Sequence, residues 1–172
     1  MRNVVAIWTL LLCSIVGSAQ SQQTSVGHIF IVRHAEKVSE TADELSVQGK
    51  TRAACLATTL KDSKITAVIV SPTNRAQQTA RPTAEEFKVQ VKSIKPDDYS
   101  AIAAAAKDAA RNGDVLIVGH SNTVPLIVNT IGNADVTVGD NEYDKLFVID
   151  SAGVAQLHYC PTSGTEPESR MK

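Results

Sequence analysis

Residues 28–36 read HIFIVRHAE, an apolar run rich in β-branched residues that ends in Arg33, His34, Ala35 and Glu36. A continuous apolar run of this length is typical of a strand that is buried on both faces, as in a parallel sheet. Helices must then cover both faces of that sheet. Because ligands bind beyond the carboxyl ends of such strands, the charged residues after the run stand where a functional site is expected.

Two further runs have the same form. ITAVIV at 65–70 leads into Ser71-Pro72-Thr73-Asn74-Arg75, and DVLIVGH at 114–120 leads into Ser121-Asn122. Periodicity and end signals predict the remaining elements: helices over 46–60 (with Ser46 as N-cap), 75–87, 101–110 and 124–131, a strand over 89–94, and a hairpin of strands 145–150 and 154–159. The alternation predicts an α/β fold, a three-layer sandwich with a mostly parallel central sheet and helices on both faces.

Polar residues at three strand ends make a set suited to phosphate. Arginine grips two phosphate oxygens through its planar fork, so Arg33 and Arg75 could clamp the group from two sides. A neutral imidazole can attack phosphorus. We assign that role to His34, which directly follows a buried strand, and we assign anion stabilisation to His120, which precedes a helix N-terminus. Ser121 stands where backbone N–H groups would add donors to the same anion.

These residues resemble the motifs of the histidine phosphatase superfamily, also called phosphoglycerate mutase-like. Four motifs occur in order over residues 28–160: Arg33-His34-Ala35-Glu36 for an RHG-type signature with alanine replacing glycine, Leu45-Ser46-Val47-Gln48-Gly49 at a helix start, Ser71-Pro72 with Arg75 and Gln78-Thr79-Ala80, and Gly119-His120-Ser121. The resemblance implies a phosphohistidine at His34, a phosphate pocket built from Arg33, Arg75 and His120, and no metal or organic cofactor.

The chain departs from the family in its proton donor and in its size. Relatives that act on alcohol phosphates need a carboxylic acid to protonate the leaving oxygen. One branch has it directly after the late histidine, where this chain has Ser121. Another has it after the third strand, where we favour Asp98, then Asp97, with Glu36 a more distant choice. The chain lacks the cap insertion of the sugar-phosphate mutases, so it resembles the small SixA-like branch.

The first residues have the pattern of an export signal. Arg2 precedes the apolar run Val4 to Val16, and Gly17-Ser18-Ala19 offers small residues for cleavage. We expect a signal peptide at 1–19, a flexible lead-in at 20–26, the phosphatase domain at 27–160 and a flexible tail at 161–172. The mature protein is then periplasmic or secreted, with no membrane contact after signal cleavage.

Charge and cysteine usage narrow the classes of partner. The net charge is −1 for 172 residues and becomes −2 without Arg2, which disfavours nucleic acid as a partner. Cys55 and Cys160 remain in the expected mature chain and have no zinc-type spacing. In an oxidising compartment they could pair, but a buried free thiol at Cys55 fits the sequence equally well.

The leading hypothesis is therefore an exported, metal-independent phosphatase that hydrolyses phosphate monoesters of a small molecule or phosphoprotein through a phosphohistidine. The alternatives are a phosphohistidine (protein) phosphatase and a non-catalytic phosphate-binding module. Metal hydrolysis through His34, Glu36 and His120 is disfavoured because neighbouring arginines would repel a cation. The oligomeric state stays open.

Overall fold

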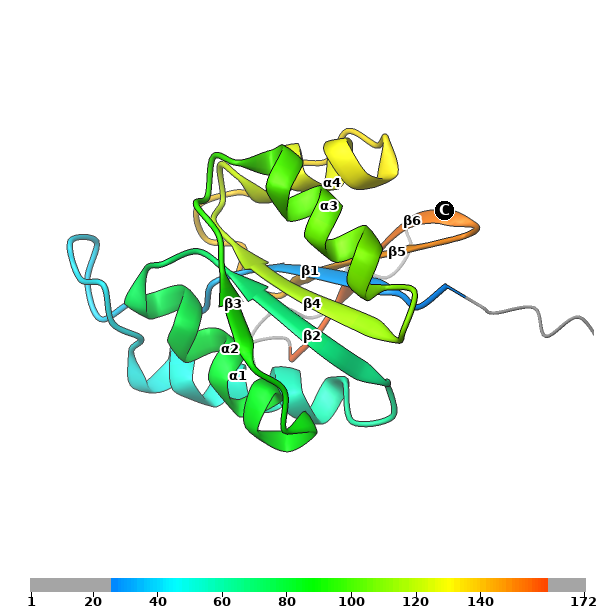
Figure 1. Ribbon diagram of the computed structural model, residues 1–172. Coiled ribbons are helices and arrows are strands. Elements are labelled where there is room, and N and C mark those ends of the chain that lie inside the picture. Colours follow the sequence, from blue (N-terminus) through cyan, green and yellow to red (C-terminus); the bar gives the residue numbers. More distant parts are fainter. Residues whose placement is uncertain (1–25, 161–172) are drawn as a thin grey trace, which may run out of the picture.

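The computed structural model describes residues 26–160, in which strands and helices alternate along the chain (Figure 1). The expected signal peptide, most of the lead-in and the tail at 161–172 lie outside the described residues. The elements are β1 (Ile29–Arg33), α1 (Val47–Thr59), β2 (Ile65–Val70), α2 (Asn74–Phe87), β3 (Val91–Ser93), α3 (Tyr99–Ala109), β4 (Asp114–Gly119), α4 (Val124–Gly132), β5 (Lys145–Asp150) and β6 (Gly153–His158).

The strands form one six-stranded sheet in the order β3-β2-β4-β1-β5-β6. The first four strands in that order pair in parallel, whereas β5 runs antiparallel to β1 and forms a hairpin with β6. The two central strands, β1 and β4, are buried along their whole length, as their continuous apolar sequences predict. The predicted α/β fold with a mostly parallel sheet is therefore confirmed.

Helices cover both faces of the sheet. Figure 1 shows α1 and α2 on one face and α3 and α4 on the other. Because successive side chains of a strand point to opposite faces, β1 contributes to both cores. Phe30 and Val32 pack in the core that includes residues of α1 and α2, while Ile29 and Ile31 pack in the core that includes α3 and α4.

Two elements differ from their predicted bounds by more than one residue, each for a local reason. The strand predicted over 89–94 is reduced to Val91–Ser93, whose side chains are all exposed, because β3 is an edge strand with one neighbour. The helix predicted from 101 begins at Tyr99, since the Asp98 side chain accepts a hydrogen bond from the backbone N–H of Ala101 and caps it. The predicted N-cap of α1 is confirmed: the Ser46 side chain accepts from the backbone N–H of Gly49.

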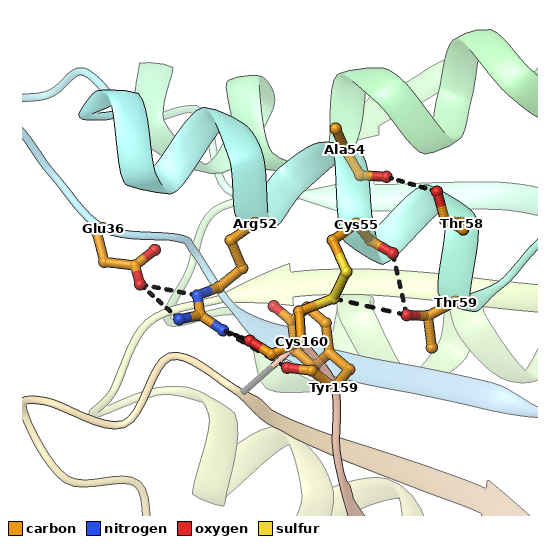
Figure 2. Close-up of a disulfide and its surroundings, with 8 residues drawn as sticks. All are labelled: Glu36, Arg52, Ala54, Cys55, Thr58, Thr59, Tyr159 and Cys160. Carbon is orange, nitrogen blue, oxygen red and sulfur yellow. Dashed lines mark hydrogen bonds and ion pairs between the residues drawn. A yellow bond between two sulfur atoms is a disulfide. The ribbon is translucent and has the colours of Figure 1, made fainter. Parts of the chain in front are cut away.

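A disulfide joins Cys55 in α1 to Cys160 just after β6, with the two Cα atoms 6.3 Å apart (Figure 2). It closes a sequence separation of 105 residues and so resolves the alternative that the sequence left open. Among the residues that the structure describes, no helix is long and apolar enough to cross a membrane.

Candidate active site

The residues predicted at three strand ends lie around one cavity of about 410 Å³ at the carboxyl edge of the parallel strands. Arg33 ends β1, His34 follows it, Arg75 lies in the first turn of α2, and His120 follows β4. The ring centroids of the two histidines are 5.3 Å apart. The cavity is lined by Arg33, His34, Lys37, Glu40, Thr73, Arg75, Pro96, His120, Ser121, Asn122, Thr123 and Asp140.

His34 is buried and its ring orientation is fixed by the backbone. Its ring Nδ1 lies 2.8 Å from the carbonyl oxygen of Ala35. A carbonyl only accepts, so Nδ1 carries the proton and Nε2 keeps its lone pair. The His34 backbone N–H donates to the Gly119 carbonyl of the neighbouring strand at 2.9 Å. The imidazole is therefore held in the tautomer that leaves Nε2 able to act as a nucleophile.

The pKa of His34 is lowered to about 4, mainly by burial, while the hydrogen bond to the Ala35 carbonyl opposes the shift and electrostatic repulsion from Arg33, His120 and Arg75 contributes to it. The ring is therefore neutral at neutral pH. Only the neutral ring has the lone pair that nucleophilic attack requires.

Arg33 is buried and held by the loop that precedes β5. Its Nη1 donates to the carbonyl oxygens of Gly139 and Asp140 at 2.9 and 2.7 Å. Its guanidinium lies over the ring of Tyr143, 4.1 Å from the centroid, and Nη2 is 3.4 Å from that hydroxyl. The loop thus fixes the arginine at the cavity wall, and the buried Nε has no partner among residues 26–160.

His120 makes one hydrogen bond through each ring nitrogen. Arg75 Nη2 lies 3.4 Å from Nδ1, and the Ser71 hydroxyl lies 2.9 Å from Nε2. Because a guanidinium only donates, Nδ1 accepts, and Nε2–H donates to Ser71. Burial lowers the pKa of His120 to about 4, helped by Arg75 and Arg33 and opposed by Asp43. The sequence predicts that His120 donates to an anion, and Nδ1 can do so only if it carries a proton, either after protonation of the ring or after a tautomer shift in which Nε2 accepts from the Ser71 hydroxyl.

Arg75 has a partner that the sequence did not indicate. Its Nη1 lies 2.7 Å from a carboxylate oxygen of Asp43. Asp43 also accepts from the backbone N–H groups of Asn74 (2.9 Å) and Arg75 (3.4 Å), and these bonds, led by that of Asn74, lower the pKa of its carboxyl. Asp43 therefore does two things: it caps α2, whose own Thr73 makes no side-chain cap bond, and it holds Arg75.

The three carboxylates proposed as proton donor do not reach the cavity lining. Asp98 is exposed and caps α3, and Asp97 is exposed on the same turn. Glu36 turns away from the cavity and its carboxylate lies 2.7 Å from Nη2 of Arg52. The Asp98 side chain is engaged by the helix that follows, so the cavity lining gives no support to the preference for Asp98 as proton donor. Within the described part of the chain, the carboxylates that line the cavity are Glu40 and Asp140.

Other predicted residues fall where the sequence placed them. Ser121 and Asn122 line the cavity ahead of α4. The motif residue Thr79 is fully buried and its hydroxyl accepts from the backbone N–H of Ala35, which supports the His34 turn. Among residues 26–160, no three His, Cys, Asp or Glu side chains are grouped so that they could hold a metal ion. Glu36 in particular is not turned toward His34 and His120.

Sequence reasoning also missed Lys37, Glu40, Asp140 and Tyr143. Each reaches the cavity or Arg33 from a loop, and the loops at 37–45 and 139–143 carry no periodic pattern. One signal was available. The run of turn formers and charges between His34 and the α1 cap predicts a loop that starts at the site itself.

Comparisons with known proteins agree with the motifs found in the sequence. Residues 29–96 match the sequence profile described as histidine phosphatase superfamily (branch 1). No curated protein sequence matches the chain.

Several solved structures share the fold. A protein from Nakamurella multipartitia that carries the name phosphohistidine phosphatase SixA is 20% identical with a TM-score of 0.58, over 80% of this chain and 97% of that one. The phosphoglycerate mutase from Bacillus anthracis is 15% identical with a TM-score of 0.60, over 78% and 93% of the two chains. The alpha-ribazole phosphatase from Shigella flexneri is 19% identical with a TM-score of 0.53, over 81% and 100%. At these identities the likeness establishes the fold alone.

The resemblance inferred from the motifs is therefore confirmed, in sequence over residues 29–96 and in fold over the described domain, and the family it points to is the histidine phosphatase superfamily.

Proposed function

We propose that the protein is a phosphatase that transfers a phosphoryl group from its substrate to Nε2 of His34 and then to water. The observation that carries this is the fixed tautomer of His34. Its Nδ1–H is committed to the Ala35 carbonyl, and the remaining lone pair belongs to a buried, neutral ring in a cavity shared with two arginines.

The reaction has two steps. In the first, the Nε2 lone pair forms a bond to phosphorus while the bond from phosphorus to the leaving atom breaks, and that atom takes up a proton. In the second, water attacks phosphorus and gives up a proton, the P–N bond breaks with its electron pair returning to Nε2, and inorganic phosphate leaves; the released proton balances the one taken up in the first step. Arg33 and Arg75 stabilise the negative charge on the peripheral oxygens in both steps.

Anion binding would also change His120. A phosphate dianion beside the ring favours its protonated form, and an Nδ1–H would then donate to a phosphate oxygen. Arg75 currently donates to that nitrogen at 3.4 Å, so its guanidinium would turn from the histidine to the phosphate. Histidine and arginine would then bind the same anion.

A phosphate monoester is our leading substrate class, and Glu40 and Asp140, the described carboxylates that line the cavity, are our candidates for protonating the leaving oxygen. The position of Asp97, Asp98 and Glu36 outside the lining favours a second candidate, a phosphohistidine (protein) phosphatase. Its leaving imidazole needs less acid help than an alkoxide does. A non-catalytic phosphate-binding module is the remaining alternative.

The decisive experiment uses purified mature protein and a panel of aryl, alkyl and histidyl phosphates, without added metal. We expect turnover, and acid-quench trapping should give a labelled enzyme whose adduct is acid-labile and base-stable. The label should be absent from His34→Ala. Rapid cleavage of a phosphohistidine peptide with no alkyl phosphatase activity would select the second candidate. Stabilisation by phosphate without hydrolysis would leave only the binding module.

We also propose that the protein acts outside the cytoplasm. The sequence pattern of residues 1–19 supports export, and the disulfide between Cys55 and Cys160 supports it independently, because such bonds persist in oxidising compartments. N-terminal sequencing of protein recovered from cell fractions tests this. A mature chain that begins at Gln20 in a non-cytoplasmic fraction is the expected result, and an intact leader on cytoplasmic protein would contradict it.

A further inference from the structure

A buried ion pair lies behind the turn that carries His34. Glu36, two residues after the histidine, points away from the cavity toward Arg52 of α1. Arg52 Nε and Nη2 lie 2.8 and 2.7 Å from the same carboxylate oxygen, and the two side chains are only 5% and 12% exposed for Arg52 and Glu36. Removal of one partner from a buried pair leaves an uncompensated charge, so this contact strongly constrains both residues.

The same guanidinium also holds the end of the domain. Arg52 Nη1 donates to the backbone carbonyl of Cys160 at 2.8 Å and lies 3.5 Å from that of Tyr159. Cys160 is bonded to Cys55, which is three residues after Arg52 and therefore on the same side of α1. Figure 2 shows the guanidinium between the Glu36 carboxylate and the residues at the disulfide. The disulfide thus keeps these carbonyl groups beside the arginine.

Glu36 is also fixed to α1 through its backbone. The N–H of Ser46 donates to the Glu36 carbonyl at 2.9 Å. A Cβ atom at Gly49 would lie 2.2 Å from that carbonyl oxygen, so the close approach requires glycine. Ala35, between His34 and Glu36, supplies the carbonyl that receives the imidazole Nδ1–H. A shift of Glu36 would therefore move the group that fixes the tautomer of His34.

We propose that Arg52 is a positioning residue for His34, and that it passes the constraint of the Cys55–Cys160 disulfide through Glu36 to the Ala35 carbonyl. The inference deepens the proposed function, on which its effect on turnover rests. It also means that the redox state of the disulfide, whose cysteines are not among the residues lining the cavity, controls how well His34 is oriented.

The kinetic test compares Arg52→Met, Arg52→Lys and Glu36→Gln with the parent enzyme on an aryl phosphate. A displacement of the reacting group by about 1 Å can cost about 100-fold in rate, so we expect kcat to fall about 10- to 100-fold in Arg52→Met. KM and the inhibition constant of inorganic phosphate should change little, because Arg33, Arg75 and His120 remain in place. Arg52→Lys should lie between Arg52→Met and the parent, since a lysine replaces the charge but not the fork.

Two further variants test whether the effect of the disulfide reaches His34 through Arg52 and Glu36. If Arg52 acts through Glu36, the double variant Glu36→Gln with Arg52→Met should be no slower than Arg52→Met alone. Cys55→Ser with Cys160→Ser should lower kcat in the same direction but by less, since the arginine keeps its contact with Glu36. Glu85→Gln is the matched control because it removes the carboxylate of an exposed ion pair with Arg81 on α2, and it should leave kcat unchanged.

A readout without substrate separates this inference from the proposed function. ¹⁵N-edited NMR should detect a slowly exchanging Nδ1–H of His34 in the parent protein, and its exchange should accelerate in Arg52→Met and Glu36→Gln. If the parent hydrolyses no phosphate compound but this proton responds, the positioning role stands and the proposed function fails. If both folded variants keep the parental kcat and the parental proton exchange, the inference is overturned. Should Arg52→Met not fold, the proton exchange of Glu36→Gln decides. That variant should still fold, because its amide oxygen still accepts from Arg52.

Discussion

The segments at the carboxyl ends of β1 and β3, here called the central and the edge exit, lie on the same edge of the sheet and carry charged residues, yet they have different structures. β1 ends in Arg33 and the turn after it holds His34 and Glu36, and all three side chains are buried or largely buried. The turn after β3 holds Asp97 and Asp98, both exposed. The Glu36 carboxylate in the first turn pairs with Arg52 of α1, whereas within residues 26–160 the Asp98 side chain accepts from the backbone N–H of Ala101 in its own helix.

The position of the strand in the sheet accounts for the difference. β1 lies between β4 and β5, so the residues at its carboxyl end are held from both sides: Gly119 at the end of β4 accepts from the His34 backbone, and Gly139 in the loop before β5 accepts from the Arg33 side chain. β3 is an edge strand with β2 as its one neighbour. A polar residue after a central strand is therefore desolvated and held from several sides, whereas one after an edge strand finds water and local backbone.

The largest effect should come from removing the nucleophile at the central exit. His34→Ala should lower kcat/KM by at least about 10³-fold, because among the described residues that line the cavity no other offers a neutral imidazole whose second nitrogen is hydrogen-bonded to a carbonyl. His34→Gln is a useful companion that retains a polar side chain of similar length. Steady-state kinetics of both variants, with folding checked by circular dichroism, measures this. Parental turnover in either variant would show that His34 is not the nucleophile.

The pKa of His34, at the central exit, should also differ from that of a free histidine. With the pKa lowered from 6.5 to about 4 by burial, His34 stays neutral as the pH falls from 7 to about 5 and gains its proton only near 4. The kcat/KM of the enzyme, corrected for substrate ionisation, should therefore show no loss from this group until the pH approaches 4. Imidazole resonances followed by NMR report the midpoint directly. A midpoint near 6.5 would contradict the buried, neutral ring.

An intermediate effect is expected at Arg75, which is held from the 37–45 loop. Asp43→Ala should raise KM about 3- to 10-fold, because the guanidinium loses its charge-assisted hydrogen bond and samples other positions. Asp43→Asn keeps an acceptor for the N-terminal N–H groups of α2 but loses the charge. It therefore separates the capping role from the role in holding Arg75. Inhibition by inorganic phosphate provides the measurement, and equal affinities for all three proteins would show that Arg75 does not need Asp43.

The smallest effect on activity should occur at the edge exit. Asp98→Ala should change kcat/KM by less than about twofold while costing about 1 kcal/mol of unfolding free energy through the lost cap of α3. Asp98→Asn, which can still cap, should restore the stability. Chemical denaturation and steady-state kinetics on the same samples test both. A loss of turnover in Asp98→Asn with normal stability would return Asp98 to the list of proton donors.

The strands and the four cavity residues were predictable because they depend on local patterns. Apolar runs that end in charged residues mark β1, β2 and β4, and the parallel arrangement then brings Arg33, His34, Arg75 and His120 to one edge. The proton donor was not predictable in this way. Asp98 and Glu40 are both charged residues in loops, and only contacts between distant segments decide that Glu40 lines the cavity and Asp98 does not. The edge strand β3 was also predicted too long. Its residues are exposed, so little packing against a core favours a longer strand.

By itself the sequence determined the α/β architecture, the candidate nucleophile and the candidate phosphate-binding residues, because strand burial and motif spacing are encoded within short segments. Only the tertiary structure decided which partners these residues have: Asp43 for Arg75, Ser71 for His120, and Arg52 for Glu36. It also decided that Cys55 pairs with Cys160. The physical reason is that hydrogen bonds and ion pairs act over a few ångströms, and the chain brings residues 16 to 105 positions apart within that distance only when it folds.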